Sequence, residues 1–146
     1  GYMEKDRGTS FPSAYAWFQS NCSADTSSCF FFSLAQIPFL KTTFQGCICV
    51  LMFGSCQLRF ATYLGCRVTW DKKHHELILR QYPLKLRIRF FGDQGQILAA
   101  PKDGNMKERI SETLQGEAYV TLICRNRHIK SWHFTQGGLE RSGITI

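Results

Sequence analysis

The fold class is decided by the stretch Leu84-Lys85-Leu86-Arg87-Ile88-Arg89-Phe90. Apolar and basic side chains alternate strictly along it, and a period of two is typical of a strand with one buried and one solvated face. Half-buried strands of this kind are common in antiparallel sheets. The stretch therefore predicts an antiparallel sheet in which Leu86, Ile88 and Phe90 share a buried face.

Turn signals divide the rest of the chain into a meander of short strands. Gly54-Ser55, Gly92-Asp93-Gln94-Gly95 and Gly137-Gly138 are typical of tight turns. The predicted strands are Ser13–Ser20, Cys29–Ile37, Thr43–Phe53, Cys56–Leu64, Cys66–Trp70, Glu76–Gln81, Leu84–Phe91, Gln96–Ala100, Glu117–Arg125, Ile129–Phe134 and Leu139–Ile146.

One short amphipathic helix is expected late in the chain. Asn105 is a suitable N-cap, Met106, Ile110 and Leu114 recur at helical spacing, and Gly116 would end the helix. We therefore predict a mainly β fold over residues 1–146, a single lipocalin-like domain. It would be an antiparallel barrel or a strongly curved sheet, with the helix across a barrel end or a sheet edge. Such a barrel can enclose one apolar ligand.

The composition is that of a globular chain. It contains 44% hydrophobic and 20% charged residues, and 12 of its 146 residues are Phe. Aromatic side chains fill β cores and line apolar cavities. No apolar run approaches the roughly 20 residues of a membrane helix, so no integral membrane segment is expected.

The net charge of +7 raises the question of nucleic-acid binding. Lys85, Arg87 and Arg89, however, occupy the wet face of a half-buried strand. The sequence contains no basic helix and no Gly-rich phosphate loop. We therefore expect no nucleic-acid partner.

The seven cysteines fit neither a disulfide framework nor a zinc site. Their number is odd, no C-x-x-C pair occurs, and the adjacent His74 and His75 would point to opposite faces of a strand. We expect free, buried thiols, no metal and a reducing, cytoplasmic location. The positions are Cys22, Cys29, Cys47, Cys49, Cys56, Cys66 and Cys124.

The N-terminal stretch is the first candidate for a site. A charged loop, Glu4–Pro12, leads into the strand Ser13–Ser20, on which Tyr15, Trp17 and Gln19 point one way. Loop and strand could form the rim and wall of a pocket. The alternative is a solvated turn before an ordinary core strand.

Five motifs resemble segments of the tocopherol cyclase family, and they follow the family's order. The family pattern EK-x-x-G-x-x-FP … W-x-Q-x-N resembles Glu4-Lys5 to Pro12 and then Trp17 to Asn21. Its F-x-G … YRFATY-x-G strands resemble Phe44-Gln45-Gly46 and Leu58–Gly65. Leu98–Pro101, the segment with Met106 and Gly138–Gly143 follow.

The resemblance covers about the C-terminal half of the family's chain. Each half of that chain is expected to be lipocalin-like, so the partner here would be a missing N-terminal half or a second copy in a homo-oligomer. Two positions depart from the family pattern. Arg7 stands where the family usually has Trp, and Cys22 stands where bacterial relatives often have His.

The resemblance implies cofactor-free cyclisation of a prenylated benzoquinol to a chromanol. An acid kept protonated by an apolar setting would protonate the alkene, and the phenol oxygen would attack the resulting cation. The candidate catalytic residues are Glu4, Lys5 and Glu140. The candidate ligand-binding residues are Tyr15, Trp17, Gln19, Asn21, Phe60 and Tyr63.

Two alternatives remain open. The chain could be a lipocalin-like module that binds an apolar or prenyl ligand without turning it over. It could also be a basic binding protein for anionic partners. For cyclisation and for ligand binding without turnover, we expect an apolar prenylated small molecule as partner. We also expect a location that is cytoplasmic or peripheral to membrane lipids.

Overall fold

The fold is a strongly curved antiparallel sheet. The computed structural model describes residues 12–93 and 95–144. The elements are β1 (Tyr15–Ser20), β2 (Cys22–Ser23), β3 (Cys29–Phe39), β4 (Thr42–Phe53), β5 (Cys56–Ala61), the 3₁₀ turn η1 (Thr62–Leu64), β6 (Arg67–Asp71), β7 (Glu76–Gln81), β8 (Leu84–Phe91), β9 (Gln96–Lys102), β10 (Asn105–Cys124) and β11 (Arg127–Ser142). The predicted mainly β, antiparallel fold is confirmed.

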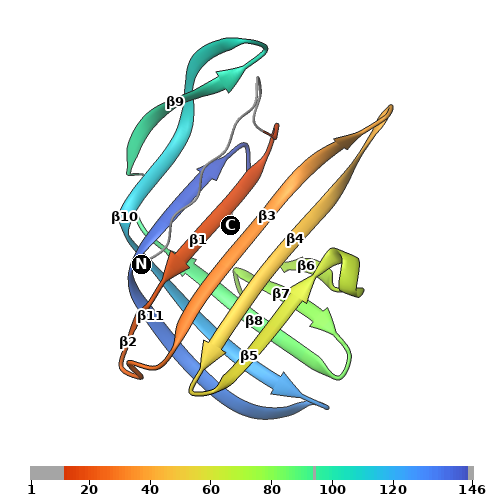
Figure 1. The fold of residues 1–146 in the computed structure, drawn as a ribbon, viewed down its shortest axis with the longest axis vertical. Helices are drawn as coiled ribbons and strands as arrows, with labels where there is room; N and C mark the ends of the chain where they lie inside the picture. The colour runs from red at the N-terminus through yellow and green to blue at the C-terminus, as the bar shows by residue number, and fades with distance from the viewer. Residues whose placement is uncertain (1–11, 94, 145–146) are drawn as a thin grey trace.

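The strand order is β5-β4-β3-β1-β11-β10-β8-β7-β6, with β2 paired to β11 and β9 to β10. Figure 1 shows the sheet curling round, so that β3, β4 and β5 cross in front of β7 and β8. The curvature brings the two end strands, β5 and β6, to the two sides of one seam. η1 connects them along the chain.

A side chain spans this seam. The amide of Ala61 donates to Oε1 of Gln81 at 3.1 Å, and Nε2 of Gln81 donates to the carbonyl of Arg59 at 2.9 Å. The amide of Cys66 also donates to the carbonyl of Ala61. Within the described residues no strand ladder joins β5 to β6, so the sheet is curved and not closed.

The concave face of the sheet holds a core of packed aromatic rings. Phe18 lies 5.9 Å from Phe30 and 5.3 Å from Phe90, and Phe30 stacks on Phe134 at 5.5 Å between ring centroids. Phe32 lies 5.2 Å from Phe90. Tilted and offset rings at these separations pack favourably beyond the area they bury. This core is therefore filled by the protein's own side chains.

The alternation in β8 places its side chains as the sequence predicts. Leu86 and Ile88 are fully buried, and Phe90 packs against the same core. Arg87 and Arg89 lie on the opposite, outer face, where both contact Glu76. The prediction of a shared buried face is confirmed.

The predicted helix Met106–Leu114 is wrong, because these residues belong to the long strand β10. They pair with β9 from Lys102 to Gln96 and, from Ser111 on, with β11. Met106 and Leu114 are 65% and 73% exposed, so their helical spacing marks no buried face. Pairing with β9, joined from Ser111 on by pairing with β11, outweighs a weak local helical preference.

Two of the predicted turns are also wrong. Gly137-Gly138 lies inside β11, which runs unbroken from Arg127 to Ser142. The segment 92–95 does not close a hairpin, since β8 and β9 both pair with β10 and succeed each other along its edge.

All seven cysteines are free thiols, of which Cys47, Cys49 and Cys66 are buried. A hydrogen bond to Cys66 and burial raise the pKa of Cys47, and burial raises the pKa of Cys49. In the described part of the chain, no three His, Cys, Asp or Glu residues are grouped to hold a metal ion. Residues 12–93 and 95–144 include no helix long and apolar enough for a membrane crossing.

Candidate functional site

The N-terminal candidates are only partly visible, because Glu4 and Lys5 lie outside the described residues. Tyr15, Trp17 and Gln19 share the outer face of β1, as their alternation with the buried Ala16 and Phe18 requires. Asn21 is exposed between β1 and β2. Tyr15 is buried on this face against Ala35, Ala100 and Ile110, whereas Trp17 and Gln19 are half-buried. The strand half of the predicted site therefore lies on the outer side of the sheet and not in the wall of the aromatic core.

Glu140 joins this surface from β11. It is paired in register with Trp17, and the hydroxyl of Tyr15 donates to its Oε1 atom. Burial raises the pKa of Tyr15 above its ordinary range, and the bond to Glu140 adds to this. The phenol thus keeps its proton, which it donates in the hydrogen bond to Glu140.

Arg109 ties the same surface together. Its guanidinium donates to the carbonyl of Pro12 at 2.8 Å and to Oγ of Ser142 at 3.1 Å. Arg109 lies at a register shift of β10, where a bulge re-aims a side chain. The bulge therefore positions the one cation that reaches the start of β1 in the described chain.

The remaining ligand-binding candidates lie elsewhere. Phe60 is fully buried within the aromatic core, whereas Tyr63 is 67% exposed in η1. Trp17 meets Phe31 edge-on at 6.2 Å between ring centroids. The structure therefore brings together Tyr15, Trp17 and Glu140, and separates them from Phe60 and Tyr63.

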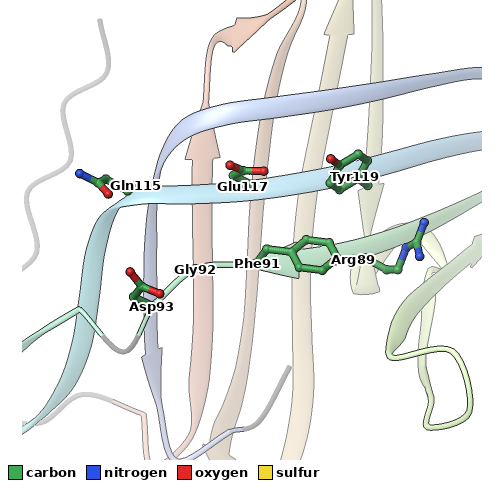
Figure 2. Close-up of a pocket in the computed structure, with 7 residues that line it drawn as sticks. All are labelled: Arg89, Phe91, Gly92, Asp93, Gln115, Glu117 and Tyr119. Carbon is green, nitrogen blue, oxygen red and sulfur yellow. The ribbon is translucent and has the colours of Figure 1, made fainter.

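A groove of about 590 Å³ lies on the outer face between β8 and β10. Figure 2 shows its residues on two neighbouring strands. Gln115, Glu117 and Tyr119 are spaced along β10, and Arg89, Phe91, Gly92 and Asp93 lie along β8 and the loop that follows it.

Aromatic and charged groups alternate in this groove. Phe91 meets Tyr119 edge-on at 5.5 Å between ring centroids, and the guanidinium of Arg89 lies 5.9 Å from the centre of the Tyr119 ring. His133 of β11 stacks on Tyr119 at 4.0 Å, and its Nε2 atom lies 2.7 Å from Oε2 of Glu117. The Tyr119 ring is thereby held between its neighbours.

Three polar groups of the groove are available to a ligand. In the described chain, no hydrogen bond is made by the Asp93 carboxylate, the Gln115 side-chain amide or the Tyr119 hydroxyl. Phe91 is 48% exposed and offers a ring face beside them. The groove can therefore receive a planar ring that carries hydroxyl groups.

Glu76 anchors the basic side of the groove. Its carboxylate, with only 9% of the side chain exposed, accepts from Nε of Arg87 at 2.7 Å and lies 3.5 Å from Nε of Arg89. Charge-assisted bonds of this kind fix side-chain direction as well as adding energy. Arg89 is thus held at the groove and turned toward Tyr119.

A second hollow of about 500 Å³ lies beside the loop between β2 and β3, with Asp25, Lys130 and Trp132 among its lining residues. Nζ of Lys130 lies 2.7 Å from Asp25, and Ser28 donates to the same carboxylate. The Trp132 indole in turn donates to Ser28. These groups bind one another, which leaves this hollow less suited to a ligand than the groove.

The sequence reasoning missed the groove. The alternation in β8 predicts only that Arg89 lies on a solvated face, and the predicted helix ending at Gly116 separates Gln115 from Glu117 and Tyr119, which share its strand. The period-two series Gln115, Glu117, Tyr119, Thr121 was the signal that could have found it.

Comparison of the chain with family models, with curated proteins and with solved structures gives no match.

Proposed function

We propose that this chain is a tocopherol cyclase-like module that binds a prenylated, hydroxyl-bearing aromatic ring in the groove between β8 and β10. One observation carries the proposal: the groove sets the rings of Phe91 and Tyr119 beside hydrogen-bonding groups that have no partner in the described chain. The motifs that resemble the cyclase family support the choice of ligand class.

The headgroup of such a ligand has matching groups in the groove. The ring would lie on the exposed face of Phe91, and a ring hydroxyl would donate to Asp93 or accept from the amide of Gln115. Binding would fix the headgroup by hydrogen bonds and leave the tail outside the aromatic core.

Binding without turnover is favoured by the contacts of three carboxyl groups that lie near the candidate surfaces. Protonation of an alkene needs a neutral carboxylic acid. Glu140 accepts from Tyr15, Glu117 lies against His133, and Glu76 is bound by Arg87. Each of these three carboxyl groups is held by a neighbouring side chain, so none of them is free to approach an alkene.

Titration of the protein with geranylhydroquinone, followed by calorimetry, tests this proposal. Phe91→Ala should weaken binding about tenfold, which corresponds to about 1.4 kcal/mol. Phe39→Ala is the matched control, because Phe39 is also an exposed phenylalanine but lies on another hairpin. Equal affinity of the Phe91→Ala variant and the wild type would overturn the assignment of the groove.

Cyclisation is a second candidate, favoured by the convergence of Tyr15, Trp17 and Glu140 directly after the loop that carries Glu4. Glu4 would then supply the proton, and the ring of Trp17 would face the cation. In this case Glu4→Gln abolishes chromanol formation, whereas Glu140→Gln retains it. A wild-type chain that binds geranylhydroquinone and forms no chromanol would contradict cyclisation and leave the binding function intact.

A further inference from the structure

The hairpin of β3 and β4 extends beyond the sheet as a two-stranded arm. β1 pairs with β3 only as far as Ala35, and β5 pairs with β4 only from Ile48. Gln36 and Gln45 still make hydrogen bonds to Ala14 and Thr62, but residues 37–44 have strand pairing only with each other in the described chain. In Figure 1 the arm reaches the upper right end of the molecule.

One face of this arm is apolar and exposed. Ile37 and Phe44 are paired in register, and Phe39 lies on the same face with its ring 6.2 Å from that of Phe44. Their exposed fractions are 37%, 44% and 60%. Because these side chains stay in contact with water, their exposed surface contributes no hydrophobic stabilisation to the described fold.

The turn of the arm also exposes an apolar side chain to water. Leu40 is 93% exposed and has a φ of +54°, a backbone conformation that Asn, Asp and Gly adopt far more readily than leucine. The corresponding turn of the β9–β10 hairpin uses Asp103-Gly104. In water, Leu40 is therefore unfavourable in both conformation and exposure.

A second arm points the same way. Residues 105–110 of β10 pair with β9 before the pairing with β11 begins at Ser111. Figure 1, drawn with the longest axis vertical, shows the β9–β10 turn and the β3–β4 turn at the same upper end. The second arm adds Met106, which is 65% exposed, to the apolar side chains at this end.

Basic residues flank the apolar ones. Lys41 follows Leu40 in the first turn, and Lys102 and Lys107 lie on either side of the second turn. These three basic residues outnumber the two acidic residues of the second arm, Asp103 and Glu108. The whole chain carries a net charge of +7. Apolar tips beside lysines are typical of surfaces that enter the headgroup region of an anionic membrane.

We propose that this end of the molecule docks on an anionic lipid bilayer, with Phe39 and Leu40 inserted among the headgroups and Lys41 paired with lipid phosphates. Insertion would remove the exposed leucine from water. The lysines would supply long-range attraction that salt weakens. This docking does not depend on the ligand proposed for the groove.

Cosedimentation with vesicles, without any quinol, tests the proposal. Wild-type protein should bind vesicles of equal parts phosphatidylcholine and phosphatidylserine, and bind pure phosphatidylcholine more weakly. Leu40→Asn should reduce binding about tenfold while its melting temperature stays equal or rises, because Asn tolerates the positive φ. Lys41→Gln should reduce binding only to the anionic vesicles.

The control is Ile129→Asn. Ile129 is 52% exposed and follows the β10–β11 turn, which Figure 1 shows at the lower end of the molecule. This variant should bind vesicles as the wild type does. Equal binding of Leu40→Asn and wild type would overturn the proposal, as would a wild type that ignores vesicles and instead forms a dimer that Leu40→Asn dissociates.

Discussion

Close approach of strands at single residues shapes the core, and Gly137 shows this against the buried ring of Phe18. A Cβ atom there would lie 2.5 Å from Cζ of Phe18 and 3.0 Å from the carbonyl oxygen of Gln19. The Phe18 ring is held between Phe30 and Phe90. Neither the ring nor the backbone oxygen can retreat without disturbing the aromatic core.

Gly137→Ala should therefore lower the free energy of unfolding by about 2 kcal/mol, a typical cost of overpacking. Gly46→Ala is the matched control. Its added methyl group would meet the end of the Ile37 side chain, which is 37% exposed and can rotate away. Urea denaturation should show a large loss for the first variant and a small change for the second, and equal losses would contradict this account of the core.

At the scale of elements, the loop between β2 and β3 is attached to β11 through one carboxylate. Asp25 accepts from Lys130 and from the hydroxyls of Ser27 and Ser28. The bond to Lys130, followed by those to the two serines, holds the pKa of Asp25 below its usual value of 3.8. Ser28 also accepts from Trp132, so the carboxylate supports a core side chain indirectly.

This lowered pKa predicts an acid-sensitive contribution to stability. The contribution is fully present above pH 3.8, where an unfolded Asp is ionised, and is lost as the pH falls through the lower pKa of the folded state. Asp25→Asn should therefore lower the melting temperature at neutral pH, and the difference from wild type should shrink in acid. Asp93→Asn is the control, and a pH-independent difference for Asp25→Asn would refute the prediction.

Elements with a strict local pattern could be predicted from the sequence. The alternation of β8 gave its buried face, and β7 begins and ends as predicted. β10 could not be predicted in its first half, because Met106, Ile110 and Leu114 carry a helical spacing while the pairing with β9 that decides their conformation is not local. The same strand carries half of the groove, so the error in the element concealed the site.

Candidate residues divide in a similar way. The motifs predict Tyr15, Trp17 and Glu140 as site residues, and two strands distant in sequence bring these three side chains together. The motif that contains Phe60 and Tyr63 predicts both on one strand. The strand β5 ends at Ala61, however, so Phe60 lies in the core and Tyr63 lies exposed in η1. Local sequence specifies on which face of the sheet a strand residue lies. It does not specify which side chains of the neighbouring strand lie beside that residue.

At the scale of the whole molecule, the seam between β5 and the β6–β7 end of the sheet is bridged in part by the side-chain amide of Gln81, the last residue of β7. Ala61, whose backbone N–H it receives, is fully buried. A buried N–H left without a partner costs about 1–3 kcal/mol. The Gln81 side chain thus supplies β5 with hydrogen-bond partners that a neighbouring strand supplies elsewhere in the sheet.

Gln81→Ala should lower the free energy of unfolding by about 2 kcal/mol and speed hydrogen exchange at the Ala61 amide. Gln81→Glu keeps an acceptor for Ala61 but cannot donate to the carbonyl of Arg59, so its stability should fall between that of the wild type and that of Gln81→Ala. Unchanged exchange at Ala61 in the alanine variant would show that the seam does not depend on this side chain.

The proposed ligand site is tested most directly by a nitrogen-15 NMR titration with geranylhydroquinone. We predict saturable shifts of backbone amides in two stretches that are distant in sequence, and a loss of those shifts in the Phe91→Ala variant. The stretches are 89–93, at the end of β8 and in the loop that follows it, and 115–119 on β10. Saturable shifts centred instead on Tyr15 to Gln19, or no saturable shifts at all, would contradict the assignment of the groove as the binding site.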